Sequence, residues 1–145
     1  MARLSPRLQK IADSLPLNPG IRILEIGCGP GVLAREICRR IGTGYVLAID
    51  RSDKAIRQGE ELSQPEIHTG ILKFKKLAIE DFELEKDEEK FDLIFGIRVG
   101  ALDGRHPALG AIAFSKIVNA LKTNGKFFID SGATIKEINL NAYRK

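Results

Sequence analysis

A glycine-rich turn near the N-terminus places the tightest constraint on the fold of this chain. The apolar segment 21–26 has the character of a buried strand, and it runs directly into Gly-Cys-Gly-Pro-Gly at 27–31. Apolar residues then recur at helical spacing over 32–41, before Gly42 ends the helix. A strand, a glycine turn and a helix in this order predict one unit of an α/β fold, in which the next strand lies parallel to the first.

The rest of the chain repeats this alternation. Buried strands are expected at 21–26, 45–49, 72–78, 91–97 and 126–130. Helices are expected at 6–15, 32–41, 52–62 and 109–121. The third strand is the least apolar and is therefore expected near the sheet edge. On the third helix, the inward residues are expected to be Ala55, Ile56, Gly59 and Leu62. The pattern predicts an α/β three-layer sandwich with a mostly parallel sheet of five or more strands and helices on both faces.

Length and composition indicate one globular domain. The chain has 145 residues, of which 43% are hydrophobic and 29% charged. We divide it into an N-terminal helix or lid (1–19), a core (20–131) and a short tail (132–145). No apolar run approaches the roughly 18 residues of a membrane span, and the N-terminus lacks an apolar signal core, so a cytoplasmic location without membrane contact is expected. Two cysteines and two histidines offer little for a metal site, and none is expected.

Two features point to a ligand at the glycine turn. Glycines let the backbone approach a ligand closely, and the following helix presents free N–H groups. Asp50 ends the next strand, where its carboxylate can accept both hydroxyl protons of a ribose. The alternatives are a tight turn without a ligand and an Asp50 that only caps a turn. Because Gly29 and Gly31 are two residues apart, the turn departs from the G-x-G-x-x-G of dinucleotide sites, which disfavours a nicotinamide-dependent oxidoreductase.

These segments resemble the class I S-adenosylmethionine-dependent methyltransferases. The matching sequences, in the family's order, are ILEIGCGPG (23–31), VLAID (46–50), LKFKKLAIEDFEL (72–84), KFDLIFG (90–96) and ALKTNGKFFID (120–130). Together they cover most of residues 20–131. The resemblance implies a Rossmann-like fold, S-adenosyl-L-methionine as the cofactor, and methyl transfer as the activity.

The resemblance also implies how the glycine turn holds the cofactor. Gly27, Cys28 and Gly29 are expected along its methionine and ribose portions. Glu25 is expected to brace the loop and to reach the cofactor's amino group, directly or through water.

The nucleoside end is expected at the neighbouring strands. By the resemblance, Asp50 holds the ribose hydroxyls and Arg51 flanks the adenine. The third segment departs from the family pattern, because Ala78 stands where the family often has an acidic or hydroxyl side chain. The backbone N–H of Ile79 is expected to bind a ring nitrogen instead, with Glu80 as a substitute for the missing acid.

The methyl acceptor is expected beyond the fourth strand. The resemblance places Gly96 under the sulfonium end, and loops at the carboxyl ends of parallel strands bind ligands in open α/β sheets. We therefore expect the acceptor at 97–107, with the N-terminal helix as a lid. Arg98 is a candidate to clamp a carboxylate or phosphate, or else a structural ion-pair partner; His106 is a candidate proton acceptor, or else an ordinary loop residue. The sequence assigns no catalytic residue.

The expected partner is a small-molecule methyl acceptor. The fourth strand is not followed by the Asn/Asp-Pro-Pro-Tyr run of nucleic-acid amino methylases, so nucleic acid is not expected. The family core usually continues past the fifth strand with a helix and an antiparallel hairpin, whereas only 131–145 follow here. We expect one short strand or helix there, in a minimal enzyme, a fragment or a chain completed by a partner. An open fifth-strand edge would favour a homodimer. The alternative function is a non-catalytic or partner-dependent module that binds S-adenosylmethionine or S-adenosylhomocysteine.

Overall fold

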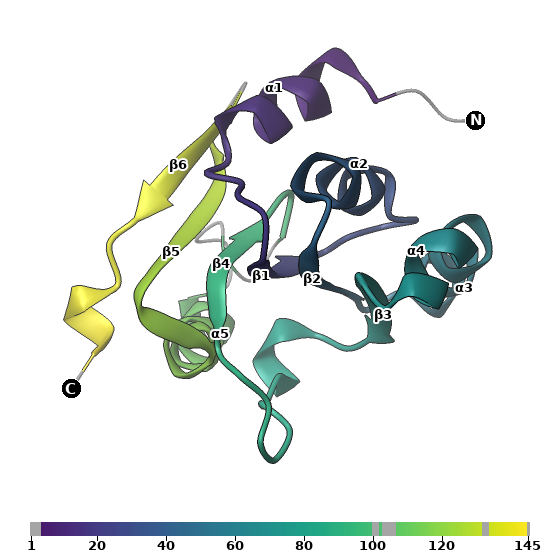
Figure 1. The fold of residues 1–145 in the computed structure, drawn as a ribbon. Helices are drawn as coiled ribbons and strands as arrows, with labels where there is room; N and C mark the ends of the chain where they lie inside the picture. Colours follow the sequence, from purple (N-terminus) through teal and green to yellow (C-terminus); the bar gives the residue numbers. More distant parts are fainter. Residues whose placement is uncertain (1–3, 100–101, 103–106, 132–133, 145) are drawn as a thin grey trace.

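The structure is a computed structural model that describes residues 4–99, 102, 107–131 and 134–144. A six-stranded sheet has the order β3-β2-β1-β4-β5-β6 (Figure 1). Its strands are β1 (Ile21–Ile26), β2 (Gly44–Asp50), β3 (Leu72–Lys76), β4 (Phe91–Gly96), β5 (Leu121–Ser131) and β6 (Thr134–Ile138). The first five strands are parallel, and β6 is antiparallel to β5. The predicted α/β class with a mostly parallel sheet is confirmed, and β3 lies at the edge as expected.

Helices cover both faces of the sheet (Figure 1). They are α1 (Pro6–Ser14), α2 (Val32–Ile41), α3 (Asp53–Leu62), α4 (Gln64–Thr69) and α5 (Pro107–Ala120), with short 3₁₀ turns η1 (Ile79–Asp81) and η3 (Asn141–Tyr143). Helix α1 begins at the expected residue and α3 one residue later, and the hydroxyls of Ser5 and Ser52 cap them by accepting from the N–H groups of Leu8 and Ala55. Within the described ranges, no helix combines the length and the apolar character needed to cross a bilayer.

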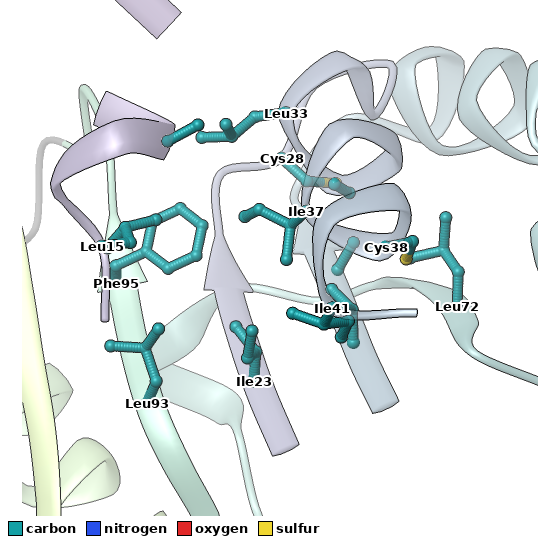
Figure 2. Close-up of a cluster of buried hydrophobic side chains, with 14 of the residues drawn as sticks. Leu15, Ile23, Cys28, Leu33, Ile37, Cys38, Ile41, Leu72, Leu93 and Phe95 are labelled. Atoms are coloured by element: carbon teal, nitrogen blue, oxygen red, sulfur yellow. The ribbon is translucent and has the colours of Figure 1, made fainter. Parts of the chain in front are cut away.

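The strands divide the core into two layers by alternation of their side chains. Ile23 of β1 packs on the side of α1 and α2, together with Ile37 and Phe95 (Figure 2). The neighbouring residues Leu24 and Ile26 pack on the opposite side, in the cluster that contains residues of α5. This two-residue period puts Glu25 on the same side as Ile23, facing α1 and α2 rather than α5.

The connection between β2 and β3 contains a helix that the sequence analysis missed. Helix α4 buries none of its own residues, so it leaves no apolar period in the sequence. The prediction that Leu62 faces inward is also wrong, since its side chain is 55% exposed. The buried position at this turn is taken by Ser63, whose hydroxyl accepts a hydrogen bond from Arg35 Nη1 at 2.8 Å.

Strand β5 begins earlier than predicted. Helix α5 ends at Ala120 and the strand starts at Leu121, without a separate turn at Asn124 and Gly125. Phe91 of β4 pairs with Leu121, but Leu93 pairs with Lys126, so β5 advances five residues while β4 advances two. The three additional residues form an irregularity in the strand, and Asn124-Gly125 lies inside it.

The tail forms a strand that pairs along β5. Residues of β6 pair with β5 from Phe127↔Ile138 to Ser131↔Thr134. A short strand or helix was expected here; the tail forms the strand β6 and then the 3₁₀ turn η3, and the fifth strand does not present an open edge. The argument for a homodimer from such an edge therefore has no basis, and β6 is the strand that ends the sheet on this side.

Candidate functional site

The site lies where the carboxyl ends of β1, β2 and β4 meet. Strand β1 has β2 on one side and β4 on the other, and such a change of direction in the strand order is where open α/β sheets bind ligands. A cavity of about 770 Å³ lies here, between the glycine turn, the ends of β2 and β4, the start of η1 and helix α1. This volume is within the range of small-molecule and cofactor sites, roughly 300–1,000 Å³.

Hydrogen bonds join the glycine turn directly to the end of β2. The N–H groups of Gly27 and Cys28 donate to the Ile49 carbonyl at 2.8 and 3.0 Å. The N–H of Gly29 donates to Asp50 Oδ2 at 2.8 Å, and the N–H of Ser52 donates to Asp50 Oδ1 at 2.9 Å. Asp50 therefore does cap the turn. These two hydrogen bonds do not use all the acceptor sites of the carboxylate, because each oxygen has a second lone pair for a ligand hydroxyl.

The glycines of the turn meet different steric demands. All three have left-handed backbone angles, with φ of 75° at Gly27, 55° at Gly29 and 84° at Gly31. A Cβ at Gly31 would lie 2.6 Å from the ring of Phe74, whereas a Cβ at Gly29 would have no atom of the described chain within 4 Å. Gly31 is thus required for packing under the loop, and Gly29 leaves open space beside the cavity.

Arg35, which the sequence analysis did not single out, makes hydrogen bonds that hold the glycine turn in place. Arg35 Nη1 donates to the Pro30 carbonyl at 2.7 Å and to the Ser63 hydroxyl at 2.8 Å. It lies four residues after Gly31, so its side chain reaches back one helical turn to the loop. That spacing is a signal in the sequence, but the contact to Ser63 depends on the tertiary fold.

Glu25 is a buried carboxyl group at the floor of the cavity. It is 3% exposed, lines the cavity, and its Oε1 has no hydrogen-bond partner among the residues that the structure describes. Burial raises the pKa of Glu25 to about 8, and the nearby negative charge of Asp50 adds to this effect. Native proteins pair the large majority of their buried polar atoms, and this unpaired oxygen is available to a polar group of a ligand in the cavity.

Cys28 is the second titratable group at the floor of the cavity, and its thiol is unreactive at neutral pH. Its side chain packs with Ile37 beneath the loop (Figure 2). Burial raises the pKa of the Cys28 thiol, and the negative charges of Glu25 and Asp50 raise it further. The thiol therefore stays protonated and is not a nucleophile at neutral pH.

The far wall of the cavity contains the residues predicted for the nucleoside end. Asp50, Arg51, Ile79 and Glu80 all line it. Ile79 and Glu80 are the first two residues of η1, and the turn's first internal hydrogen bond comes later, from the Asp81 N–H to the Ala78 carbonyl. The N–H groups of Ile79 and Glu80 thus precede the internal bonds of the turn, as at the start of any helix.

The structure does not bring Gly96 into the cavity wall. A Cβ at Gly96 would meet the side chains of Leu102 at 2.8 Å and Val99 at 3.2 Å, which cover it. The wall is formed instead by the residues that follow, Ile97, Arg98 and Val99.

The expected acceptor side of the cavity is described in part. Arg98 lines the cavity, and so do Ser5, Arg7 and Leu8 at the start of the N-terminal helix, the segment that was expected as a lid. Their place beside Arg98 could not be predicted residue by residue, because they lie far from Arg98 in the chain. His106, like most of 97–107 beyond Val99, lies outside the described residues.

The residues of the wall fit S-adenosylmethionine. Its amino group would meet an unpaired buried oxygen at Glu25, and its hydroxyls would meet free lone pairs at Asp50. The open side of Gly29 leaves room for it. In the described part of the chain, no group of three or more His, Cys, Asp or Glu residues is arranged to hold a metal ion.

Comparisons with known proteins identify the family. A family profile described as a methyltransferase domain matches residues 17–143. The chain is 29% identical to an uncharacterized methyltransferase of Schizosaccharomyces pombe over 91% of its own length and 48% of the relative's. It is 27% identical to the sterol 24-C-methyltransferase of Yarrowia lipolytica over 81% of its own length and 29% of the relative's.

Solved structures give the same fold. The S-adenosylmethionine-dependent methyltransferase of Thiobacillus denitrificans, in complex with S-adenosyl-L-homocysteine, superposes with a TM-score of 0.68 at 20% identity, covering 87% of this chain and 48% of that one. The chain spans about half or less of the length of these relatives. The predicted Rossmann-like fold is confirmed. The chain belongs to the class I S-adenosylmethionine-dependent methyltransferases, and S-adenosylmethionine is the cofactor of this family.

Proposed function

We propose that this protein transfers a methyl group from S-adenosylmethionine to a small-molecule acceptor by in-line displacement. One observation carries the proposal. The glycine turn and Asp50 are in direct contact beside a cavity whose floor contains an unpaired buried carboxyl oxygen. S-adenosylmethionine supplies a methyl group already activated by its sulfonium sulfur, so the protein needs mainly to bind, orient and exclude water.

The residues that line the cavity have distinct roles in the proposed cofactor site. Asp50 accepts hydrogen bonds from the ribose hydroxyls while its other lone pairs hold the loop. Glu25 accepts from the amino group through its unpaired Oε1. Gly27, Cys28 and Gly29 provide a backbone surface for the methionine and ribose portions.

The adenine is proposed to lie against the start of η1. The N–H groups of Ile79 and Glu80 make no hydrogen bond within η1, so they can donate to ring nitrogens. Arg51 lines the same wall and flanks the base. Ala78, which lacks a polar side chain, leaves this recognition to the backbone.

Alignment is proposed to be the main catalytic contribution of the chain. Holding two reactants in a productive orientation can lower a barrier by roughly 7–11 kcal/mol in favourable cases. Ile97 and Val99 are apolar wall residues that restrict water at the acceptor side. Leu8 of α1 contributes a third apolar side chain to the wall. His106 remains the candidate proton acceptor for an acceptor that arrives protonated, and Arg98 the candidate clamp.

A small-molecule acceptor is supported by the size of the site. The cavity has a volume of about 770 Å³, within the range of small-molecule sites, and Ser5, Arg7 and Leu8 at the start of the N-terminal helix contribute to its wall. The Yarrowia lipolytica relative is named for a sterol, which is a small molecule. A cytoplasmic location is part of this proposal.

The experiment separates catalysis from binding. Purified protein is incubated with isotopically methyl-labelled S-adenosylmethionine and pools of small-molecule acceptors, and S-adenosylhomocysteine release is followed. We expect turnover with a subset of acceptors and its loss in Asp50→Ala. Binding of S-adenosylhomocysteine without turnover on any acceptor would instead favour the non-catalytic or partner-dependent binding module, and the absence of binding would reject both.

A further inference from the structure

The edge of the cavity carries two arginines from distant parts of the chain, and both are tied to one aspartate. Arg7 Nη2 of α1 lies 3.2 Å from Asp130 Oδ2. The backbone N–H of Arg98 donates to Asp130 Oδ1 at 3.1 Å. Asp130 follows Ile129, which pairs with Gly96 at the end of β4. One carboxylate of β5 therefore fixes both α1 and the segment after β4 at the same edge.

The charges of the cavity wall are not evenly distributed. Arg7 and Arg98 both line the cavity, whereas Asp130 is not among its wall residues. The acidic residues of the wall are Glu25, Asp50 and Glu80. These acids belong to the glycine turn, the end of β2 and η1, which form the proposed cofactor site. Arg51 lies with these acids, whereas the acceptor side has the two arginines Arg7 and Arg98 and no acidic wall residue, and such a field attracts an anion.

The backbone at Arg98 is also unusual, because in the described part of the chain only Arg98 and Asp87 combine a side chain with a positive φ. Its φ is 56°, in the left-handed region that a glycine adopts without steric cost. Non-glycine residues held in this conformation occur often at functional sites, because the surrounding structure must enforce it. The hydrogen bond from the Arg98 N–H to Asp130 is one contact made in this conformation. The chain therefore has a long cationic side chain at the end of β4, at a position where a side chain is costly.

We propose that Arg7 and Arg98 are the recognition residues for the methyl acceptor, and that this acceptor carries a carboxylate or phosphate group. The inference rests on the proposed function, whose substrate class it names. Guanidinium groups present N–H donors in a fork that matches the oxygens of either anion. Asp130 orients Arg7 through the ion pair, and it also competes with the acceptor's anionic group for the Arg7 guanidinium.

Direct binding of small anions tests this assignment. Protein saturated with S-adenosylhomocysteine is titrated calorimetrically with inorganic phosphate, with benzoate and with benzamide, all at one ionic strength because salt screens exposed charges. Benzamide matches benzoate in shape but has no charge. We expect phosphate or benzoate to bind and benzamide to bind at least threefold more weakly. The phosphate and benzoate arms distinguish a phosphorylated acceptor from a carboxylic acid.

Four variants locate the binding. Arg98→Gln and Arg7→Gln should each weaken anion binding about three- to tenfold, as expected for charge-assisted hydrogen bonds from one exposed and one partly buried arginine. Asp130→Asn removes the competing charge, so it should strengthen anion binding. Arg57→Gln is the matched control, since Arg57 is an exposed residue paired with Asp53 on α3 and does not line the cavity. It removes the same charge and should leave anion binding unchanged.

The outcomes are distinguishable. Arg7→Gln removes the ion pair with Asp130 and can loosen α1. Arg98→Gln leaves this ion pair intact, so it is the deciding variant if Arg7→Gln lowers the thermal stability. If S-adenosylhomocysteine binds but the anions bind no better than benzamide, or bind Arg98→Gln as well as the unaltered protein, the inference is overturned and the proposed function stands. If S-adenosylhomocysteine itself does not bind, the proposed function fails and the inference fails with it.

Discussion

The N–H of Gly29 donates a hydrogen bond to Asp50 Oδ2 at 2.8 Å, although the two residues lie on separate strand–loop units. This contact holds the glycine turn against the end of β2, and it defines one corner of the cavity. The Asp50 carboxylate both stabilises the loop and lines the cavity. Changes at Asp50 should therefore affect both the conformation of the loop and the affinity for the cofactor.

The glycines of the turn should differ sharply in their tolerance of a side chain. Gly31→Ala is expected to lower the free energy of unfolding by about 2–4 kcal/mol, from overpacking and from a left-handed alanine. The Phe74 ring cannot move away easily, because it also packs closely against Gly59, where an added Cβ would lie 2.6 Å from the ring. Gly29→Ala, with open space around it, should cost about 1 kcal/mol. Urea denaturation of both variants measures this, and equal losses would contradict the packing described here.

Glu25 should make the stability of the ligand-free protein depend on pH. Its pKa is raised from 4.5 to about 8 in the folded state, so the folded protein binds a proton more tightly than the unfolded chain. Its contribution is fully present below about pH 4.5 and is lost as the pH rises toward 8. The loss is on the order of a few kcal/mol.

The matched variant for this effect is Glu25→Gln, which keeps the shape and removes the titration. Unfolding free energies at pH 5, 6, 7 and 8 should fall more steeply for the unaltered protein than for the variant. Parallel pH profiles would show that Glu25 does not titrate in this range.

Arg98→Gly should separate stability from acceptor recognition. Glycine relieves the left-handed backbone strain, but it also increases the entropy of the unfolded chain, so the unfolding free energy should stay equal or rise by up to about 1 kcal/mol. Anion binding should weaken as in Arg98→Gln. Thermal denaturation checks the first expectation, and a destabilisation of more than about 1 kcal/mol would mean that the arginine side chain supports the fold.

The sequence predicted those parts of the fold whose signals are local. The bounds of β1 and α2 were correct because an apolar run, a glycine turn and a C-terminal glycine lie next to one another in the chain. Helix α4 was missed because none of its residues is buried, and the inward position of Leu62 was wrong because Ser63 occupies that place. The early start of β5 depends on its pairing with β4, which no local pattern contains.

The candidate site divides in the same way. The residues of the glycine turn and Asp50 could be named from their positions at strand ends, and the structure places them around one cavity. Arg7 could not be named, because its place at the cavity depends on Asp130, which is 123 residues away. Gly96 was expected at the wall, but it is covered by Val99 and Leu102, whose packing follows from the path of the chain after β4.

Calorimetric titration of S-adenosylhomocysteine tests the central claim most directly. We expect one molecule to bind per chain, and Asp50→Ala to weaken this binding by about 1.5–3 kcal/mol through the loss of charge-assisted hydrogen bonds. Gly29→Val should abolish binding by filling the cavity edge, while Arg57→Gln should bind normally. Unchanged affinity in Asp50→Ala and Gly29→Val would contradict the claim that the cofactor lies between the glycine turn and the end of β2.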